Sequence, residues 1–139
     1  MPIIHRQKNE PYSAEEMFTL VNDVTSYPKF LPWCKDARIK VISLHIVEAS
    51  ILMAKGPLHK WFTTKNYVTP GKQIELSLIK GPFKHLKGVW NFTDLPQGGS
   101  EVECKIDFDF AFGPARIVLT PIFEGIASSL IQAFSERAR

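Results

Sequence analysis

Residues 114–137 read PARIVLTPIFEGIASSLIQAFSER, and apolar side chains recur in this stretch at steps of three and four residues. That spacing places a broad apolar stripe along one side of a helix. Thr120 and Pro121 suit the N-cap and the first helical position, because the amide that proline lacks would be unpaired there anyway. We therefore predict the main helix at about residues 121–137, with residues 115–119 as a lead-in turn or a kinked first segment. Such a helix is about 25 Å long and needs a concave apolar surface to lie on.

Polar residues interrupt this apolar stripe at Glu124, Ser128, Ser129 and Gln132. We therefore predict that the helix does not span a membrane, and no other run approaches the roughly eighteen apolar residues that a span needs. The N-terminus lacks the apolar core of a signal peptide. These features predict a cytoplasmic protein, with peripheral contact at the inner face of the membrane as an open alternative.

Length and composition indicate one domain, residues 1–139, that buries a single core. The formal net charge is +3, and the chain contains ten Phe. A mildly basic charge permits contact with RNA or acidic lipid headgroups without arguing for either. Cys34 and Cys104 are far apart and form no CxxC motif, so we expect two reduced thiols.

Most of the chain after residue 35 has the alternation and the turn residues of β-strands. Gly-Pro, Pro-Gly and Gly-Gly pairs separate the segments, and such pairs mark turns. The connections are too short for parallel crossovers, so we predict an antiparallel sheet. The strands are expected at about residues 3–9, 36–44, 46–55, 58–68, 72–80, 86–94 and 100–112.

The last of these segments shows the clearest alternation in the chain. Its apolar residues, which face one way, are Val102, Cys104, Ile106, Phe108, Phe110 and Phe112. The charged residues between them face the other way. We therefore predict that Asp107 and Asp109 are surface charges.

Two short helices are expected after the first strand. Ser13 and Glu16 have the spacing of a capping box, which opens a helix to about residue 22. We expect one helical turn at about residues 26–30. The order of elements then predicts an α+β fold: a curved seven-stranded antiparallel sheet wrapped around a long C-terminal helix. A space left between such a sheet and its helix is an apolar cavity in which a ligand can bind.

Three stretches of the chain also resemble a known family: SYPKFLPWC at 26–34, GPFKHLKGVWNF at 81–92 and QAF at 132–134. They are similar to the coenzyme-Q-binding START-like family, which includes bacterial ribosome-association toxins. That family belongs to the polyketide-cyclase and Bet v 1-like helix-grip superfamily. The resemblance implies a helix-grip fold and a lipophilic ligand, a polyprenyl quinone such as ubiquinone. For some bacterial members it also implies binding to the large ribosomal subunit and a block of subunit joining. Pro121 departs from the uninterrupted C-terminal helix of many relatives.

Large apolar side chains are concentrated on facing positions of the predicted sheet and helix. Each alone is an ordinary core residue, but as a set they are more than a compact core needs. We predict that they line a cavity of about 300 Å³ or more, the lower end for ligand pockets, which holds a flat ring and an isoprenoid chain. The candidate ligand-binding residues are Phe30, Leu31, Trp33, Phe62, Trp90, Phe92, Phe108, Phe110, Phe123, Ile126 and Leu130.

The loop around Trp33 has two interpretations that both remain open. It folds back as a lid on the core, or it forms an entrance that touches a membrane, where a Trp N–H can reach water or a headgroup. Lys29 and Lys35 flank the loop and are candidates for contact with anionic headgroups or the ribosome.

A second set of basic residues, Lys80, Lys84 and Lys87, surrounds the Gly81-Pro82 turn. Charged hairpins usually form a solvated rim that prevents edge pairing. The alternative is a surface that contacts the phosphates of ribosomal RNA, with binding that weakens steeply as salt rises. This set shows no interleaved exposed aromatic residues, which leaves the RNA interpretation with little support.

We identify no catalytic residue, no metal ligands and no required cofactor. The four histidines have no ligand spacing, and there is no nucleophile elbow or glycine-rich nucleotide loop. An inward Asp or Glu is needed for acid–base chemistry of the cyclase type. Glu48 and Glu75 are the strand carboxylates whose direction the sequence leaves open.

Three functions follow, in this order. The first is a non-enzymatic carrier or chaperone that binds ubiquinone or a similar lipid and supports respiration. The second is a toxin that binds the large ribosomal subunit, and the first two are compatible. The third is a cyclase-like enzyme.

Overall fold

The computed structural model describes residues 3–111 and 113–139. The strands are β1 (Ile3–Glu10), β2 (Cys34–Ser43), β3 (Ile46–Lys55), β4 (Leu58–Thr69), β5 (Gln73–Lys80), β6 (Phe83–Asp94) and β7 (Ser100–Phe110). The helices are α1 (Ala14–Asn22), the 3-10 helix η1 (Val24–Lys29), α2 (Pro114–Ser128) and α3 (Leu130–Arg137). The predicted strands are therefore confirmed, although β2 and β6 begin two or three residues earlier than expected.

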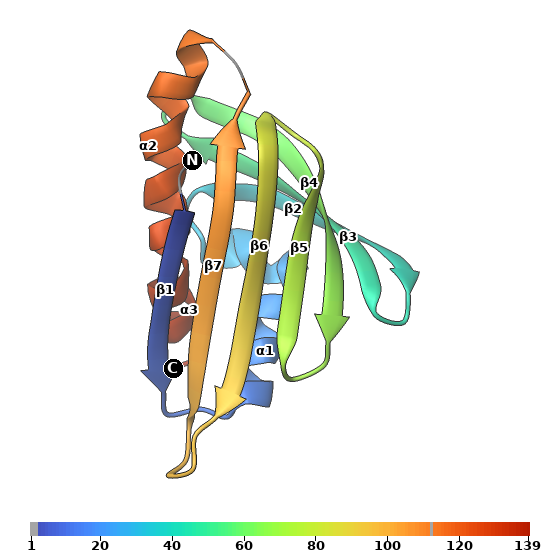
Figure 1. Ribbon diagram of the computed structural model, residues 1–139, viewed down its shortest axis with the longest axis vertical. Helices are drawn as coiled ribbons and strands as arrows, with labels where there is room; N and C mark the ends of the chain where they lie inside the picture. The colour runs from blue at the N-terminus through green and yellow to red at the C-terminus, as the bar shows by residue number, and fades with distance from the viewer. Residues whose placement is uncertain (1–2, 112) are drawn as a thin grey trace.

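The seven strands form one antiparallel sheet with the order β1-β7-β6-β5-β4-β3-β2. Strands β2 to β7 are neighbours in sequence order, because short turns allow only antiparallel pairing. β1 pairs with β7 along its whole length, from Ile3 opposite Asp107 to Glu10 opposite Ser100. Figure 1 shows α1, α2 and α3 behind the same face of the curved sheet. The predicted helix-grip architecture is confirmed.

The C-terminal helix begins earlier than predicted. α2 starts at Pro114, where the missing amide of proline costs nothing. Thr120 is not an N-cap, since its Oγ1 donates a hydrogen bond to the Arg116 carbonyl at 2.6 Å. Pro121 lies within α2 and removes one helical hydrogen bond. The prediction of a helix start at Thr120-Pro121 is therefore wrong, and residues 115–119, expected as a lead-in turn or a kinked first segment, belong to the helix itself.

Ser129 separates α2 from α3. Its hydroxyl donates to the Ile126 carbonyl at 2.8 Å, and its amide lies 3.2 Å from both the Gly125 and the Ile126 carbonyl oxygens. A serine side chain that bonds to the preceding turn competes with the helical ladder and bends the helix. The long predicted helix is thus two segments that meet at one residue.

Arg116–Arg137 is long and apolar enough to cross a membrane by length and composition alone, contrary to expectation. Helices that pack in a protein core pass the same test, so it is weak evidence for a span. In this chain Phe123, Ile126 and Phe134 from that stretch are buried. Figure 1 shows the stretch running along the sheet, so one side of it packs against the sheet, although only 33% of its most apolar window is buried.

The capping box of α1 is confirmed. The Glu16 amide donates to Ser13 Oγ at 3.1 Å, and the Ser13 amide donates to Glu16 Oε1 at 2.9 Å. Met17, Phe18 and Val21 form the buried side of α1. The helical turn expected next is η1, which contains Pro28.

The alternation of β7 is confirmed from Val102 to Phe110, and Phe112 lies outside the described residues. Asp109 is buried and forms an ion pair with Arg116 at 2.9 Å, so the prediction that it is a surface charge is wrong. The first turn of α2 follows closely after β7, and its Arg116 covers this carboxylate. Asp107 remains partly exposed and lies 3.0 Å from His85 Nε2.

Candidate functional site: an apolar cavity under the C-terminal helix

An apolar cavity of about 80 Å³ lies between the inner face of the sheet and the helices. Strands β3 to β7 supply one wall, and α1, η1, α2 and α3 supply the other. The curvature of the sheet and the position of the helix therefore create the predicted space, in the predicted place.

Six of the predicted residues line this cavity: Trp33, Phe62, Trp90, Phe123, Ile126 and Leu130. Five others do not: Phe30, Leu31, Phe92, Phe108 and Phe110. Phe92 packs edge-on against Phe18 of α1 at a centroid distance of 5.7 Å. Phe30 packs against Phe134 at 5.4 Å and lies under the Arg137 guanidinium, while Leu31 is buried in the core.

Phe108 and Phe110 belong to an aromatic cluster where β7 ends and α2 begins. Phe83 stacks on Phe110 at 4.6 Å, and Phe123 of α2 lies 4.6 Å from Phe108. These rings fill the space between sheet and helix at that end. For this part of the aromatic set, the ordinary interpretation as packed core is correct.

The cavity is much smaller than the expected minimum of about 300 Å³. Aromatic rings from two helices occupy the space: Phe134 of α3 packs against Tyr27 of η1 at 5.4 Å and against Trp90 of β6 at 5.5 Å. The prediction of a void ready for a ring and a prenyl tail is therefore wrong for this form. A ligand of that size requires the helix and the sheet to separate.

The cavity has a polar corner that the sequence analysis missed. Thr64 and Asn66 are buried on the inner face of β4, and Thr64 Oγ1 donates to Asn66 Oδ1 at 2.6 Å. Their alternation with Phe62, at every second residue, was the available signal. Trp33 also lines the cavity, and no acceptor among the described residues bonds its buried indole N–H. A buried donor without a partner is costly, but this N–H is out of reach even of water, so an acceptor oxygen on a ligand would bond it only in an opened form.

Groups suited to acid–base catalysis do not line the described part of the cavity. Glu48 and Glu75 both point away from the cavity. Their strand neighbours Ala49 and Ile74 point inward, and adjacent residues of a strand face opposite sides. Tyr27 donates its hydroxyl to the Val21 carbonyl, and burial raises its pKa. Among the described residues, no group of three or more His, Cys, Asp or Glu side chains is placed to hold a metal ion.

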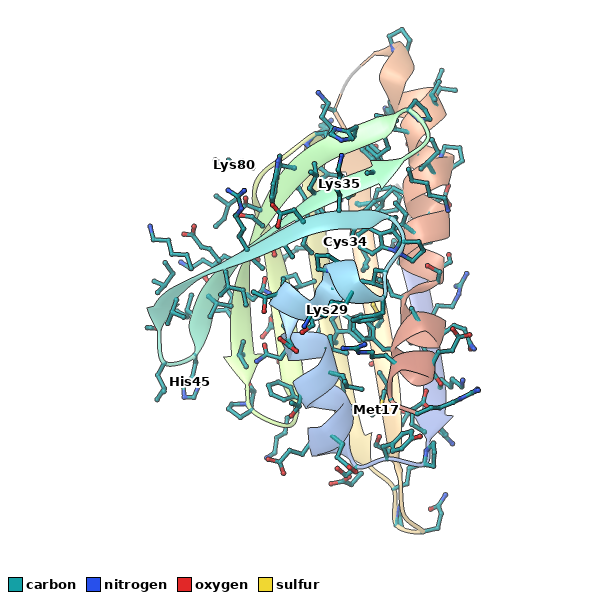
Figure 2. The ribbon with its side chains drawn as sticks, turned by 180° about the vertical axis from the view of Figure 1, so that it is seen from behind. Met17, Lys29, Cys34, Lys35, His45 and Lys80 are labelled. Atoms are coloured by element: carbon teal, nitrogen blue, oxygen red, sulfur yellow. The ribbon has the colours of Figure 1, made fainter. Side chains whose placement is uncertain are left out.

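The loop that carries Trp33 folds back on the core. Leu31 and Trp33 are 1% and 7% exposed, which corresponds to the lid interpretation and not to an entrance that presents tryptophan to a membrane. The prolines keep the loop out of regular structure, but its apolar side chains turn inward. Lys29 and Lys35 remain exposed on either side of it, as Figure 2 shows.

The basic residues near the Gly81-Pro82 turn are exposed at Lys80, Lys84 and Lys87. Lys80 pairs with Thr63 in the sheet register across an irregularity between β4 and β5. Its side chain lies on the side of the sheet away from α2 and α3 in Figure 2. At least part of this basic set therefore belongs to the outer sheet face.

Both cysteines are buried free thiols. Burial raises the pKa of Cys34 to about 11 and that of Cys104 to about 12. At pH 8 a pKa of 11 leaves about one thiolate in a thousand, and the thiolate is the reactive form. We expect both thiols to react slowly with a chromogenic disulfide reagent at pH 8 in the native protein. In denaturant both thiols should react rapidly. Rapid reaction of one thiol per chain in the native protein would contradict the burial described here.

The curved sheet, the C-terminal helix held against it and the apolar space between them define a protein of the START and Bet v 1-like class. The chain belongs to the family described as polyketide cyclase / dehydrase and lipid transport, whose model matches residues 11–135.

Several relatives with about 40% identity to this chain are named as toxins. The chain is 41% identical over 139 residues to the persistence and stress-resistance toxin PasT of Escherichia coli O6:H1, covering 100% of this chain and 88% of the relative. It is 39% identical over 136 residues to the ribosome association toxin RatA of Pseudomonas aeruginosa, covering 98% and 94%. A mitochondrial coenzyme Q-binding protein COQ10 homolog B of Xenopus laevis is 24% identical over 132 residues, which cover 91% of this chain and 54% of that protein.

Solved structures agree with the fold. The Zhui aromatase/cyclase from Streptomyces sp. R1128 aligns with a TM-score of 0.86 at 14% identity, covering 99% of this chain and 93% of that one. An 18 kDa protein from Caulobacter crescentus aligns with a TM-score of 0.77 at 31% identity, covering 99% and 96%. Proteins that share this fold therefore include one named as an enzyme and others named for what they bind.

Proposed function

We propose that this chain associates with the large ribosomal subunit in the cytoplasm and blocks the joining of the two subunits. The observation that carries the proposal is the 39% identity to the ribosome association toxin, which extends over 98% of this chain and 94% of that protein. The similarity thus extends over nearly the whole of both chains. The small cavity supports this order of functions, because in this form it does not accommodate the quinone that a carrier would hold.

Co-sedimentation with separated ribosomal subunits tests this proposal. We expect the purified chain to migrate with the large subunit at low salt and not with the small subunit. The bound fraction should fall as salt rises, because contacts with RNA phosphates release counterions. A chain that stays at the top of the gradient with either subunit at low salt would refute ribosome association.

A second function, binding of an apolar ligand that carries an acceptor oxygen, is supported by the cavity itself. Its apolar walls, its Thr64–Asn66 corner and the unpartnered Trp33 N–H suit a carbonyl-bearing ring. A quinone with an isoprenoid tail has this chemistry, and burial of the tail supplies about 0.8 kcal/mol per CH₂. Entry of such a ligand needs an opened form of the helix and sheet. The two functions are compatible in one protein.

Native mass spectrometry after incubation with a short-tailed ubiquinone tests the second function. Ala127 of α2 is buried and lines the cavity, so Ala127→Leu should fill the space and abolish the bound mass. Gln132→Leu adds the same side chain at an exposed position of α3 and should leave the bound mass unchanged. Failure of the wild-type chain to take up the quinone, or equal uptake by both variants, would argue against a ligand in this cavity.

A further inference from the structure

Among the described residues, two aromatic side chains lie exposed on the outer face of the sheet, both on β4. Trp61 and Tyr67 are 38% and 41% exposed. Each lies next to a cation: the Arg38 guanidinium is 4.9 Å from the Trp61 ring centroid, and Lys65 Nζ is 5.5 Å from the Tyr67 ring centroid. Cation–π pairs of this kind hold the charge beside the π-face.

The sheet register places these side chains on one face, some along β4 and others in a row across it. Trp61, Lys65 and Tyr67 alternate with Phe62, Thr64 and Asn66, which line the cavity on the other face. Thr63 of β4 pairs directly with Lys80 of β5. On its other side Thr63 pairs with Ser50 of β3, which in turn pairs with Arg38 of β2. We call Arg38, Trp61, Lys65, Tyr67 and Lys80 the outer track. Its two rings are six positions apart along β4, which is about 20 Å.

Carboxylates next to the outer track limit its charge. Asp36 forms an ion pair with Arg38 at 3.2 Å, in which the Arg38 side chain stays 73% exposed. Glu48 is opposite Lys65, and Glu75 is opposite Tyr67. The positive charge is therefore concentrated around Thr63, which has Arg38 and Lys80 on either side of it in the register and Trp61 two residues along β4. Such a surface favours a partner that offers stacking groups as well as phosphates.

We infer that the outer track binds a single-stranded segment of large-subunit ribosomal RNA, an inference that rests on the proposed ribosome association. An unpaired nucleotide offers a flat base, which stacks on aromatic side chains, and a phosphate, which pairs with Arg or Lys. The track offers both kinds of group in alternation: Trp61 with Arg38 and Lys80, then Tyr67 with Lys65. A length of about 20 Å spans a few extended nucleotides.

The alternation of rings and charges separates this partner from a protein or a bilayer. Protein interfaces are depleted of lysine, whereas the outer track contains Lys65 and Lys80 beside its rings. Insertion into a bilayer requires a contiguous apolar surface, and Ser50 and Thr63, hydrogen-bonded to each other at 2.8 Å, lie between Arg38 and Lys80. The chemistry of the track therefore corresponds to nucleic acid.

The test compares variants on two probes, intact large subunits and deproteinised large-subunit RNA. The double variant Trp61→Leu/Tyr67→Leu keeps apolar bulk but removes both stacking rings, and it should weaken binding to both probes by about tenfold or more. Arg38→Gln/Lys80→Gln should lower the slope of log K against log salt by about 1.4, from roughly 0.7 for each phosphate contact. Two single variants are matched controls and should bind within about twofold of wild type. Arg137→Gln removes a cation of α3 that lies beside Phe30, and Lys72→Gln removes one in the exposed β4–β5 turn. Thermal melting confirms that all variants are folded.

Each outcome has a separate meaning. If the outer-track variants bind subunits as tightly as the wild-type chain, the outer track is not the binding surface, and ribosome association itself is unaffected. A second outcome is that the variants bind intact subunits more weakly but the wild-type chain does not bind the deproteinised RNA. The partner is then a ribosomal protein, and the inference is overturned. If wild type does not bind subunits, the proposed function fails; RNA binding that still depends on Trp61 and Tyr67 would support the track independently.

Discussion

Replacing Phe134 with alanine is expected to lower the free energy of unfolding by about 3–5 kcal/mol, the usual cost of removing a buried phenyl ring. Phe134 is 1% exposed. Its ring contacts Tyr27, Phe30 and Trp90 at centroid distances of 5.4, 5.4 and 5.5 Å. One side chain of α3 thus connects η1, the following loop and β6. Its loss removes the contacts that hold the C-terminal helix in the sheet.

Urea unfolding followed by tryptophan fluorescence measures this effect. Ile117→Ala is the matched control, since it truncates an apolar residue of α2 that is 80% exposed and should change stability by less than about 0.5 kcal/mol. Equal effects of the two substitutions would mean that α3 does not pack on the sheet as described.

A second large loss of stability is expected for Gly99→Ala in the turn between β6 and β7. Gly99 has φ +76°, and a Cβ there would lie 2.2 Å from the Glu10 carbonyl oxygen at the end of β1. The left-handed backbone costs an alanine about 1–2 kcal/mol, and the clash with β1 adds about 1–3 kcal/mol. We therefore expect Gly99→Ala to lower the unfolding free energy by about 2–5 kcal/mol.

Gly98→Ala separates the two contributions. Gly98 has φ +105°, but a Cβ there meets nothing within 4 Å. Both variants carry the cost of positive φ, whereas only Gly99→Ala strains the approach of β1 to the turn. The same denaturation experiment on both proteins gives the difference. If Gly98→Ala is as destabilised as Gly99→Ala, the close contact between this turn and β1 does not contribute to the cost of a side chain at residue 99.

The architecture was predictable because its signals are local. Alternation over Val102 to Phe110 and the Ser13–Glu16 capping box each define an element without knowledge of the rest of the chain. The helix start was not predictable in the same way. Pro114 and Pro121 both suit a first helical turn, and the choice between them depends on where β7 ends. The burial of Asp109 likewise depends on Arg116 folding back over it, a tertiary contact.

The candidate site was predictable in location but not in size. Its volume depends on how the rings of Tyr27, Trp90 and Phe134 pack, and side-chain packing of this kind leaves no periodic signal. The outer track was accessible to sequence reasoning. Once Phe62, Thr64 and Asn66 are assigned to the inner face, Trp61, Lys65 and Tyr67 must share the outer one.

A subunit-joining assay tests the central claim most directly. Light scattering rises when separated ribosomal subunits associate, and we predict that a saturating excess of this chain lowers the amplitude of that rise when it is first incubated with the large subunit. Prior incubation with the small subunit alone, followed by rapid mixing, should delay the effect. Full-amplitude joining in the presence of excess folded protein would contradict the account.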